Sequence, residues 1–218
     1  MNAKKLSFLL LILVAVACTN RSTSSEQDEM RHWNNVLQQI NALLLENKAR
    51  QTLDLAKQTL PEILESAEKN GTTDTLIYYA RKIFNACGNN YINTKQYKDG
   101  IDYMDSIGNH PLIREHCPHE LLSFKAGLNQ LYGNNPEAVR LAEDYLQLPV
   151  CTSANDFIRQ AEIISGVYMY SGNNLPKAIQ ILEKAIDVYR KGGNFPNMLR
   201  IMSRLGIYYH LSGEYEKA

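Results

Sequence analysis

Three short stretches decide how this chain folds: YGNNPEA (residues 132–138), SGNNLPKA (171–178) and SGEYEKA (212–218). Each is a turn rich in Gly or Asn that ends in an alanine, and these alanines stand forty residues apart, at 138, 178 and 218. Gly and Asn tolerate left-handed backbone angles and therefore end helices. Small residues let two antiparallel helices approach closely. The pattern predicts repeated helical hairpins, with Ala49 and Gly100 as the small residues of two earlier units.

The residues between these turns have the spacing of helices. Within residues 77–91, apolar side chains recur at steps of three and four and so share one helix face: Ile77, Ala80, Phe84, Cys87 and Tyr91. No stretch longer than four residues alternates as a strand would. Residues 61–70 predict a long helix tail, followed by a break at 70–74 and a new helix from about Thr75. We expect an all-α domain of stacked helix pairs over residues 31–218, with the last pair truncated.

The unit resembles the tetratricopeptide repeat (TPR), which has a Trp or another large residue at position 4, an aliphatic residue at 7, Tyr at 11 and Phe at 24, small residues at 8, 20 and 27, and Pro at 32. The first unit matches at Trp33, Val36, Leu37, Ile40, Ala49, Leu53, Ala56 and Pro61. The second matches at Phe84, Cys87, Gly88, Tyr91, Gly100, Met104 and Ile107, the fourth at Ser165, Gly166, Met169, Ala178, Leu182 and Ala185, and the fifth at Met202, Leu205, Gly206, Tyr209 and Ala218. The third fits, at Ala126, Gly127 and Ala138, only with a shorter turn. The resemblance implies a right-handed solenoid of about four and a half repeats.

The same resemblance implies a binding groove lined by positions 2, 5, 9 and 12 of each first helix. In the first two units these are Arg31, Asn34, Gln38, Asn41, Lys82, Asn85, Asn89 and Ile92. Amide side chains can hydrogen-bond a peptide backbone, while Arg31 and Lys82 can hold a carboxylate. Some family members clamp a C-terminal carboxylate, and Asn89, Arg200 and Arg204 match clamp positions, although Asn34 and Asn85 stand where Lys is expected. The alternative is that all of these are ordinary solvated helix faces.

Catalytic and metal-binding patterns are weak in this sequence. Residues 109–120 hold four possible zinc ligands, His110, His116, Cys117 and His119, but without a standard zinc spacing. The alternative is a loop between repeats, with solvated histidines and with Pro118 opening the next helix. The chain has neither a Gly-x-Ser-x-Gly elbow nor a phosphate-binding loop, and Cys87 falls at a core position, where a thiol is inert. We predict a non-enzymatic protein without cofactor or metal.

The N-terminus predicts export. Lys4 and Lys5 precede an apolar run over residues 6–17, which as a helix spans roughly 18 Å, too short for a bilayer core of about 30 Å. Cleavage before Cys18 resembles lipoprotein processing, with residues 18–30 as a polar tether; ordinary cleavage of a secreted protein is the alternative. In an oxidising compartment Cys117 and Cys151 form a candidate disulfide, the alternative being buried thiols.

These features favour a lipid-anchored scaffold in a bacterial envelope, on its periplasmic or surface side, that binds a protein or peptide in its concave groove. Basic and acidic residues balance at 23 each, so no bulk charge recruits nucleic acid. The alternative is the sensory front of a longer regulator, with a histidine kinase or DNA-binding output beyond Ala218. The reason for this alternative is an apolar stripe on the last helix, which no following helix covers. The stripe consists of Ile201, Leu205, Tyr208 and Tyr209. Such a stripe is also a candidate surface for association.

Replacing Cys18 tests the anchor. If Cys18 carries the lipid, Cys18→Ala removes the acyl chains, and we expect the exported chain to move from the membrane fraction to the soluble fraction. Fractionation followed by immunoblotting measures this. Retention of the variant in the membrane fraction would show that the anchor lies elsewhere, and Ser22→Ala in the tether serves as the control.

Overall fold

The computed structural model describes residues 27–149, 154–192 and 195–218. Every regular element in these ranges is a helix, which confirms the all-α prediction. The first helix covers residues 27–45 and is followed by α2 (Ala49–Asn70), α3 (Asp74–Asn93), α4 (Tyr97–Ile107), α5 (Pro111–His116), α6 (Pro118–Tyr132), α7 (Asn135–Gln147), α8 (Ala154–Tyr170), α9 (Leu175–Gly192) and α10 (Phe195–Ser212).

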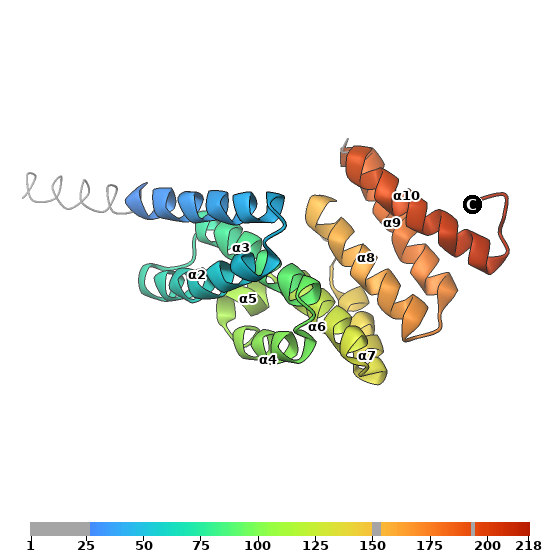
Figure 1. Cartoon of the computed structure of the whole chain (residues 1–218), viewed down its shortest axis with the longest axis horizontal. Coiled ribbons are helices and arrows are strands. Elements are labelled where there is room, and N and C mark those ends of the chain that lie inside the picture. Colours follow the sequence, from blue (N-terminus) through green and yellow to red (C-terminus); the bar gives the residue numbers. More distant parts are fainter. Residues whose placement is uncertain (1–26, 150–153, 193–194) are drawn as a thin grey trace, which may run out of the picture.

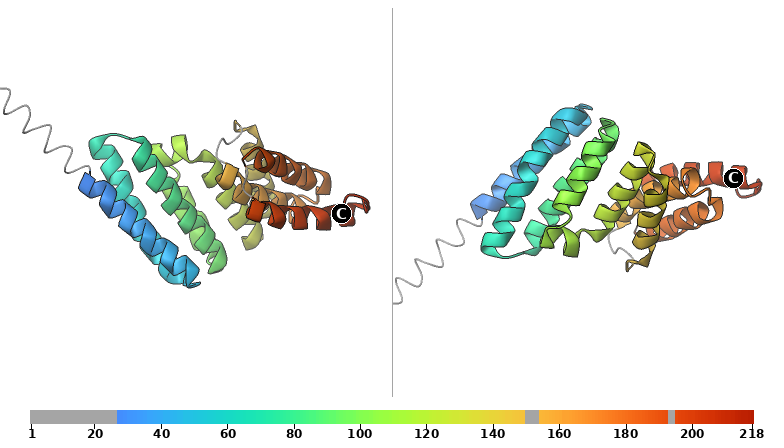
Figure 2. Two further views of the ribbon diagram at one scale, coloured as in Figure 1. Left: turned by 90° about the horizontal axis from the view of Figure 1, so that it is seen from above. Right: turned by 90° about the horizontal axis from the view of Figure 1, so that it is seen from below.

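The helices form antiparallel pairs that stack along the long axis of the molecule (Figures 1 and 2). The pairs are the helix at 27–45 with α2, α3 with α4, α6 with α7, and α8 with α9, while α10 begins a fifth unit. We call the helix at 27–45, α3, α6, α8 and α10 the first helices. The expected right-handed solenoid of TPR-like helix pairs is confirmed.

Each first helix ends at one residue with left-handed backbone angles. These residues are Asn47 (φ 56°), Lys95 (φ 59°), Gly133 (φ 96°), Asn173 (φ 43°) and Gly213 (φ 83°). The expected helix-stop chemistry of Gly and Asn therefore operates at every turn except the second, where Lys95 takes the strained angle. The amide following that lysine, on Gln96, donates to the carbonyl of Tyr91 at 3.1 Å and satisfies the helix end.

The small residue after each turn has a constant place in the second helix. It is the fourth residue of α4, α7 and α9, where Gly100, Ala138 and Ala178 are fully buried or nearly so. In α2 the fourth residue is Thr52, which is buried and whose Oγ1 donates to the Lys48 carbonyl at 2.9 Å.

The register expected for the first unit is therefore wrong by three residues. Ala49, assigned there as the small residue, is the first residue of α2 and only half-buried. Counting from Thr52 moves groove positions 2, 5, 9 and 12 of this unit onto Asn34, Leu37, Asn41 and Leu44. Asn34 and Asn41 remain groove positions in this register.

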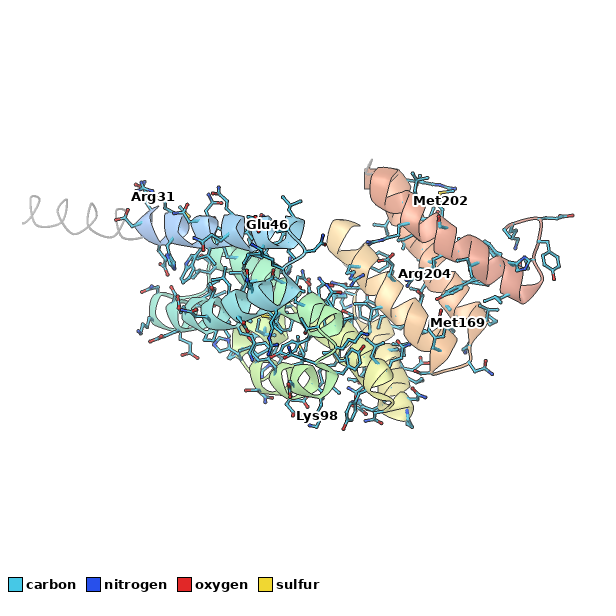
Figure 3. The ribbon with its side chains drawn as sticks, in the orientation of Figure 1. Arg31, Glu46, Lys98, Met169, Met202 and Arg204 are labelled. Atoms are coloured by element: carbon cyan, nitrogen blue, oxygen red, sulfur yellow. The ribbon has the colours of Figure 1, made fainter. Side chains whose placement is uncertain are left out.

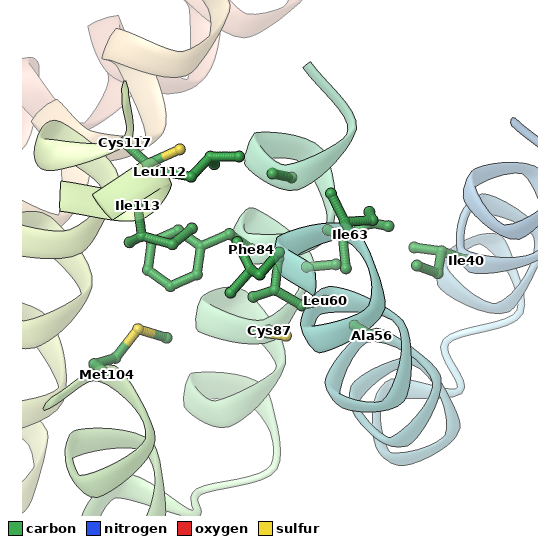
Figure 4. Close-up of a cluster of buried hydrophobic side chains, with 14 of the residues drawn as sticks. Ile40, Ala56, Leu60, Ile63, Phe84, Cys87, Met104, Leu112, Ile113 and Cys117 are labelled. Carbon is green, nitrogen blue, oxygen red and sulfur yellow. The ribbon is translucent and has the colours of Figure 1, made fainter. Parts of the chain in front are cut away.

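Two hydrophobic clusters form the core, and α6 contributes to both. Phe124 and Leu128 on α6 belong to the cluster that extends back to the helix at 27–45 (Figure 4), whereas Ala126 belongs to the cluster formed with α7 to α10. Cys87 lies inside the first cluster, as expected, and burial raises the pKa of its thiol to about 12. Cys117 is also buried, while Cys18 and Cys151 lie outside the described residues.

The last helix differs from the sequence expectation. Ile201, Leu205, Tyr208 and Tyr209 are all buried, because they pack in the second cluster with side chains of α8 and α9. The expected uncovered stripe of these four residues is therefore wrong. Among the side chains of α10 that the structure describes, Leu199, Met202, Ile207 and Leu211 are apolar and exposed.

Three local features complete the fold. The helix at 27–45 already includes residues 27–30, which were expected to belong to the polar tether. α2 continues through Pro61 to Asn70. α3 begins one residue before the expected Thr75 and is capped by Thr73, whose Oγ1 accepts a hydrogen bond from the amide of Leu76 at 3.2 Å.

None of the helices in the described ranges has an apolar stretch long enough to span a bilayer.

Consecutive first helices approach one another at glycines. A methyl group at Gly88 of α3 would overlap the Phe124 ring of α6, and one at Gly127 of α6 would lie 2.6 Å from Cγ2 of Ile163 on α8. The equivalent Gly166 of α8 is open, since a methyl group there would meet nothing closer than Oε1 of Gln130 at 3.8 Å. Two of the four seams between successive first helices are thus filled by a large side chain packed over a glycine.

Alanine at these glycines gives a paired test of this packing. Gly88→Ala forces the Phe124 ring to move, and we expect the free energy of unfolding to fall by about 1–3 kcal/mol. Gly166→Ala is the matched control, because its methyl group has room and alanine favours a helix by roughly 0.5–1 kcal/mol. Urea unfolding followed by circular dichroism measures both, and equal effects would contradict the packing described.

Candidate ligand-binding site

A pocket of about 200 Å³ lies on the face formed by the first helices. Four first helices supply its lining, among others Ile92 from α3, Gln130 from α6, Gly166 from α8 and Arg204 from α10. Because every lining residue belongs to a first helix, the pocket opens where the resemblance to TPR proteins predicts a groove.

A buried carboxylate on α8 organises the rim of this pocket. The side chain of Glu162 is 3% exposed, and its Oε2 lies 2.7 Å from Nη2 of Arg200 and 3.7 Å from Nη1 of Arg159. Arg204 Nη1 donates to the backbone carbonyl of Glu162 at 2.9 Å. Figure 3 shows Arg204 on α10. The two arginines of α10 therefore bridge to one residue of α8.

Arg159 extends this network to α3. Its Nε donates to Oδ1 of Asn89 at 2.8 Å, across 70 residues of sequence. Burial, together with the positive charges of Arg200 and Arg204, lowers the pKa of the Arg159 guanidinium, and the Glu162 carboxylate opposes that shift. The guanidinium groups of Arg159 and Arg200 thus face the Glu162 carboxylate, and that of Arg204 binds the backbone carbonyl of the same residue, which leaves positive charge in excess at the pocket.

Local sequence spacing explains the convergence. Arg200 and Arg204 are four residues apart on α10, and Arg159 and Glu162 are three apart on α8, so each pair lies on one side of its helix. Planar guanidinium groups hydrogen-bond carboxylates in a fixed geometry and stay charged when partly buried. The chemistry that suits this cluster is the binding of an anionic ligand.

The structure brings three of the residues selected from the sequence into this network, namely Asn89, Arg200 and Arg204. Asn85 lies one turn from Asn89, and its backbone carbonyl accepts from Asn89 Nδ2 at 2.9 Å. The Lys82 ammonium group lies over the Tyr78 ring, 5.7 Å from its centroid.

The residues selected on the first helix lie apart from the pocket. Arg31, Asn34, Gln38 and Asn41 are exposed on the helix at 27–45 and are not among the residues that line it. Arg31 Nη1 lies 3.7 Å from Oδ1 of Asp28.

Sequence reasoning missed Arg159 and Glu162, which stand at repeat positions 1 and 4 rather than at the consensus groove positions. The signal available was the glutamate itself. The TPR pattern has a large residue at position 4. A glutamate at that position, such as Glu162, therefore predicts a buried partner for its charge.

The histidine-rich stretch forms a short helix, α5, instead of the expected loop, although Pro118 does open α6 as expected. His110 accepts from the amide of Leu112 through Nδ1 at 3.2 Å, and its Nε2 lies 3.1 Å from Oε1 of Glu68. His119 Nε2 lies 2.7 Å from the carbonyl of Pro149. Within the part of the chain that the structure describes, no three His, Cys, Asp or Glu side chains converge as metal ligands.

Glu162→Gln tests the role of the carboxylate. The change leaves three neighbouring guanidinium groups without their counter-charge, and we expect the free energy of unfolding to fall by about 1–3 kcal/mol, less at high salt. Glu137→Gln, in an exposed pair with Arg140, is the control and should change it by at most about 0.5 kcal/mol. Denaturant unfolding at two salt concentrations measures both, and equal losses would contradict the assigned role.

Comparison with known proteins supports the fold alone. No protein-family model matches the chain, and no curated protein matches it in sequence. Among solved structures, the chain is similar to a Podosopora anserina protein described as a kinesin light chain, a structure of TPR-like repeats that are nearly identical to one another. The TM-score is 0.52 at 12% sequence identity, and the match covers 84% of this chain and 88% of that one. A variant of those repeats gives a TM-score of 0.53 at the same identity and coverage. The chain is therefore a helical repeat protein with a TPR-like fold.

Proposed function

We propose that this protein is a non-catalytic scaffold that binds an acidic segment of a partner protein at the pocket lined by α3, α6, α8 and α10. The observation that carries the proposal is the cluster of Arg159, Arg200 and Arg204 around one acidic residue, Glu162, whose carboxylate faces the first two and whose backbone carbonyl binds the third. TPR-like folds in general bind protein partners, which supports the class of function.

Charge at the cluster favours an anionic partner. Three positive groups and one negative group leave a formal excess of two, in a partly desolvated setting where charge-assisted hydrogen bonds are strong. A ligand carboxylate near Arg204 and Arg159 would also relieve the mutual repulsion of the guanidinium groups. Binding of such a carboxylate fits this charge distribution better than binding of a cation.

Turnover has no comparable support. Cys87, a potential nucleophile, lies in the core with the pKa of its thiol raised to about 12, so it carries almost no thiolate near neutral pH. A binding function accounts for the arginine cluster without requiring any reactive group.

Export and lipid anchoring belong to the same proposal. They rest on the pattern of residues 1–18, which lies outside the described residues. The scaffold would then act on the periplasmic or surface side of a bacterial envelope. The sensory-regulator alternative loses the support of the expected stripe, because Ile201, Leu205, Tyr208 and Tyr209 are covered, but it stays a prediction.

Peptide selection tests the proposal. A random dodecapeptide library is panned on the full chain, and we expect enrichment of Asp and Glu among the selected sequences. Arg200→Gln combined with Arg204→Gln should weaken their binding by roughly tenfold or more, since two charge-assisted contacts are lost. Titration calorimetry measures the affinities.

Arg190→Gln is the matched control, because Arg190 is an exposed arginine on the second helix α9, paired with Asp187. It should leave affinity unchanged. Selected sequences without acidic residues, or an equal loss in the Arg190 variant, would contradict the proposal. Circular dichroism of each variant separates loss of binding from loss of fold.

A further inference from the structure

One packing position of the solenoid, next to this pocket, is empty. At the seam between α3 and α6 the Phe124 ring seats over Gly88, and between α6 and α8 the side chain of Ile163 seats over Gly127. At the seam between α8 and α10, Gly166 lines the pocket and has nothing within 3.8 Å of the place where a methyl group would be.

The repeat register identifies the side chain that is lacking. Phe124 and Ile163 each stand three residues before the glycine of their own helix, Gly127 and Gly166. The residue three before Gly206 of α10 is Ser203, which is small, polar and exposed. At the seam between the helix at 27–45 and α3, the large residue lies on the earlier helix. Buried Ile40 stands there at the position of the glycines, and Asn85 of α3 stands at the position of Phe124. Among the four described seams, the one between α8 and α10 has a small residue at both positions, namely Gly166 and Ser203.

The empty position is surrounded by apolar side chains, with a positively charged arginine at the rim of the pocket. Ile92 and Ile163 line it, Leu131 and Tyr170 are exposed at its edge, and Arg204 reaches across from α10. Its volume of about 200 Å³ is below the roughly 300–1,000 Å³ of pockets for drug-sized ligands. A single side chain suits this space better than a whole small molecule.

We propose that this pocket accepts one aliphatic side chain of the partner, next to an acidic group held by the arginines, and that Gly166 and Ser203 determine this specificity. The inference rests on the proposed function and names the ligand as a peptide segment with Leu or Ile beside Asp or Glu. The ligand side chain takes the place that Ile163 takes over Gly127. Burial of that side chain supplies affinity, and the arginines fix the position of the segment.

Two peptides and two pocket-filling variants test this inference. The probes are fluorescein-labelled Gly-Gly-Asp-Leu-Asp-Gly-Gly-amide and the same peptide with Ala in place of Leu, titrated against the full chain by fluorescence anisotropy. We expect the Leu peptide to bind at least about tenfold more tightly, as for aliphatic groups that differ by a few methylenes. Gly166→Leu and, independently, Ser203→Ile should fill the pocket and abolish this preference while the Ala peptide still binds.

Ser106→Ile, the same change at an exposed position of α4, is the control and should keep the preference. Ser203→Ile starts from an exposed side chain, so it remains informative if Gly166→Leu fails to fold. Equal binding of both peptides to the unaltered chain, or a preserved preference in Ser203→Ile, would overturn the inference and leave the proposed function standing provided that binding still depends on Arg204. Failure of both peptides to bind would overturn the inference and the proposed function together.

Discussion

The close approach of successive first helices over a glycine is the constraint on which this solenoid depends. Each helix pair alone would expose an apolar face, and only stacking buries it. Gly88 and Gly127 let the side chains of Phe124 and Ile163 pack closely against the backbone of the preceding helix. Helix α6 stands between them and joins the two hydrophobic clusters into one stack.

Where that constraint is relaxed, a polar network replaces the apolar contact. α8 and α10 are joined at the pocket rim by Arg200 and Arg204, both directed at Glu162, rather than by a large side chain over Gly166. Burying one carboxylate among three guanidinium groups is expensive unless every partner is in place. The seam thus combines an unfilled apolar notch with excess positive charge, and this pairing of features is what a site for an acidic, aliphatic segment requires.

Much of the fold followed from the sequence because its signals are local. Left-handed turn residues such as Asn47, Asn173 and Gly133 end helices through their own backbone preferences, so the hairpins could be predicted without knowing what they pack against. The first unit failed for a specific reason. Ala49 is of the residue type found at the small position of the later units, but the equivalent residue is Thr52. Thr52 is polar and can be buried because its hydroxyl group donates a hydrogen bond to the backbone carbonyl of Lys48.

The candidate site followed less well because its signals are not local. Asn89, Arg200 and Arg204 were selected from consensus positions, but Glu162 is defined by burial, and burial depends on how α8 meets α10. The four residues of the expected stripe on α10 were misjudged for the same reason. Periodicity shows which residues share a face, such as Ile201, Leu205 and Tyr208, and packing decides what covers that face.

We propose that the ligand binds over Gly166, next to Arg159 and Arg204. The measurement that tests it most directly is a titration of the isotope-labelled chain with the acidic Leu peptide, followed by NMR. If the peptide binds there, we expect shifts at the Gly166 amide and at the side-chain NεH groups of Arg159 and Arg204, with none at Asn34 or Asn41. Shifts confined to the helix at 27–45, with Gly166 unchanged, would contradict it.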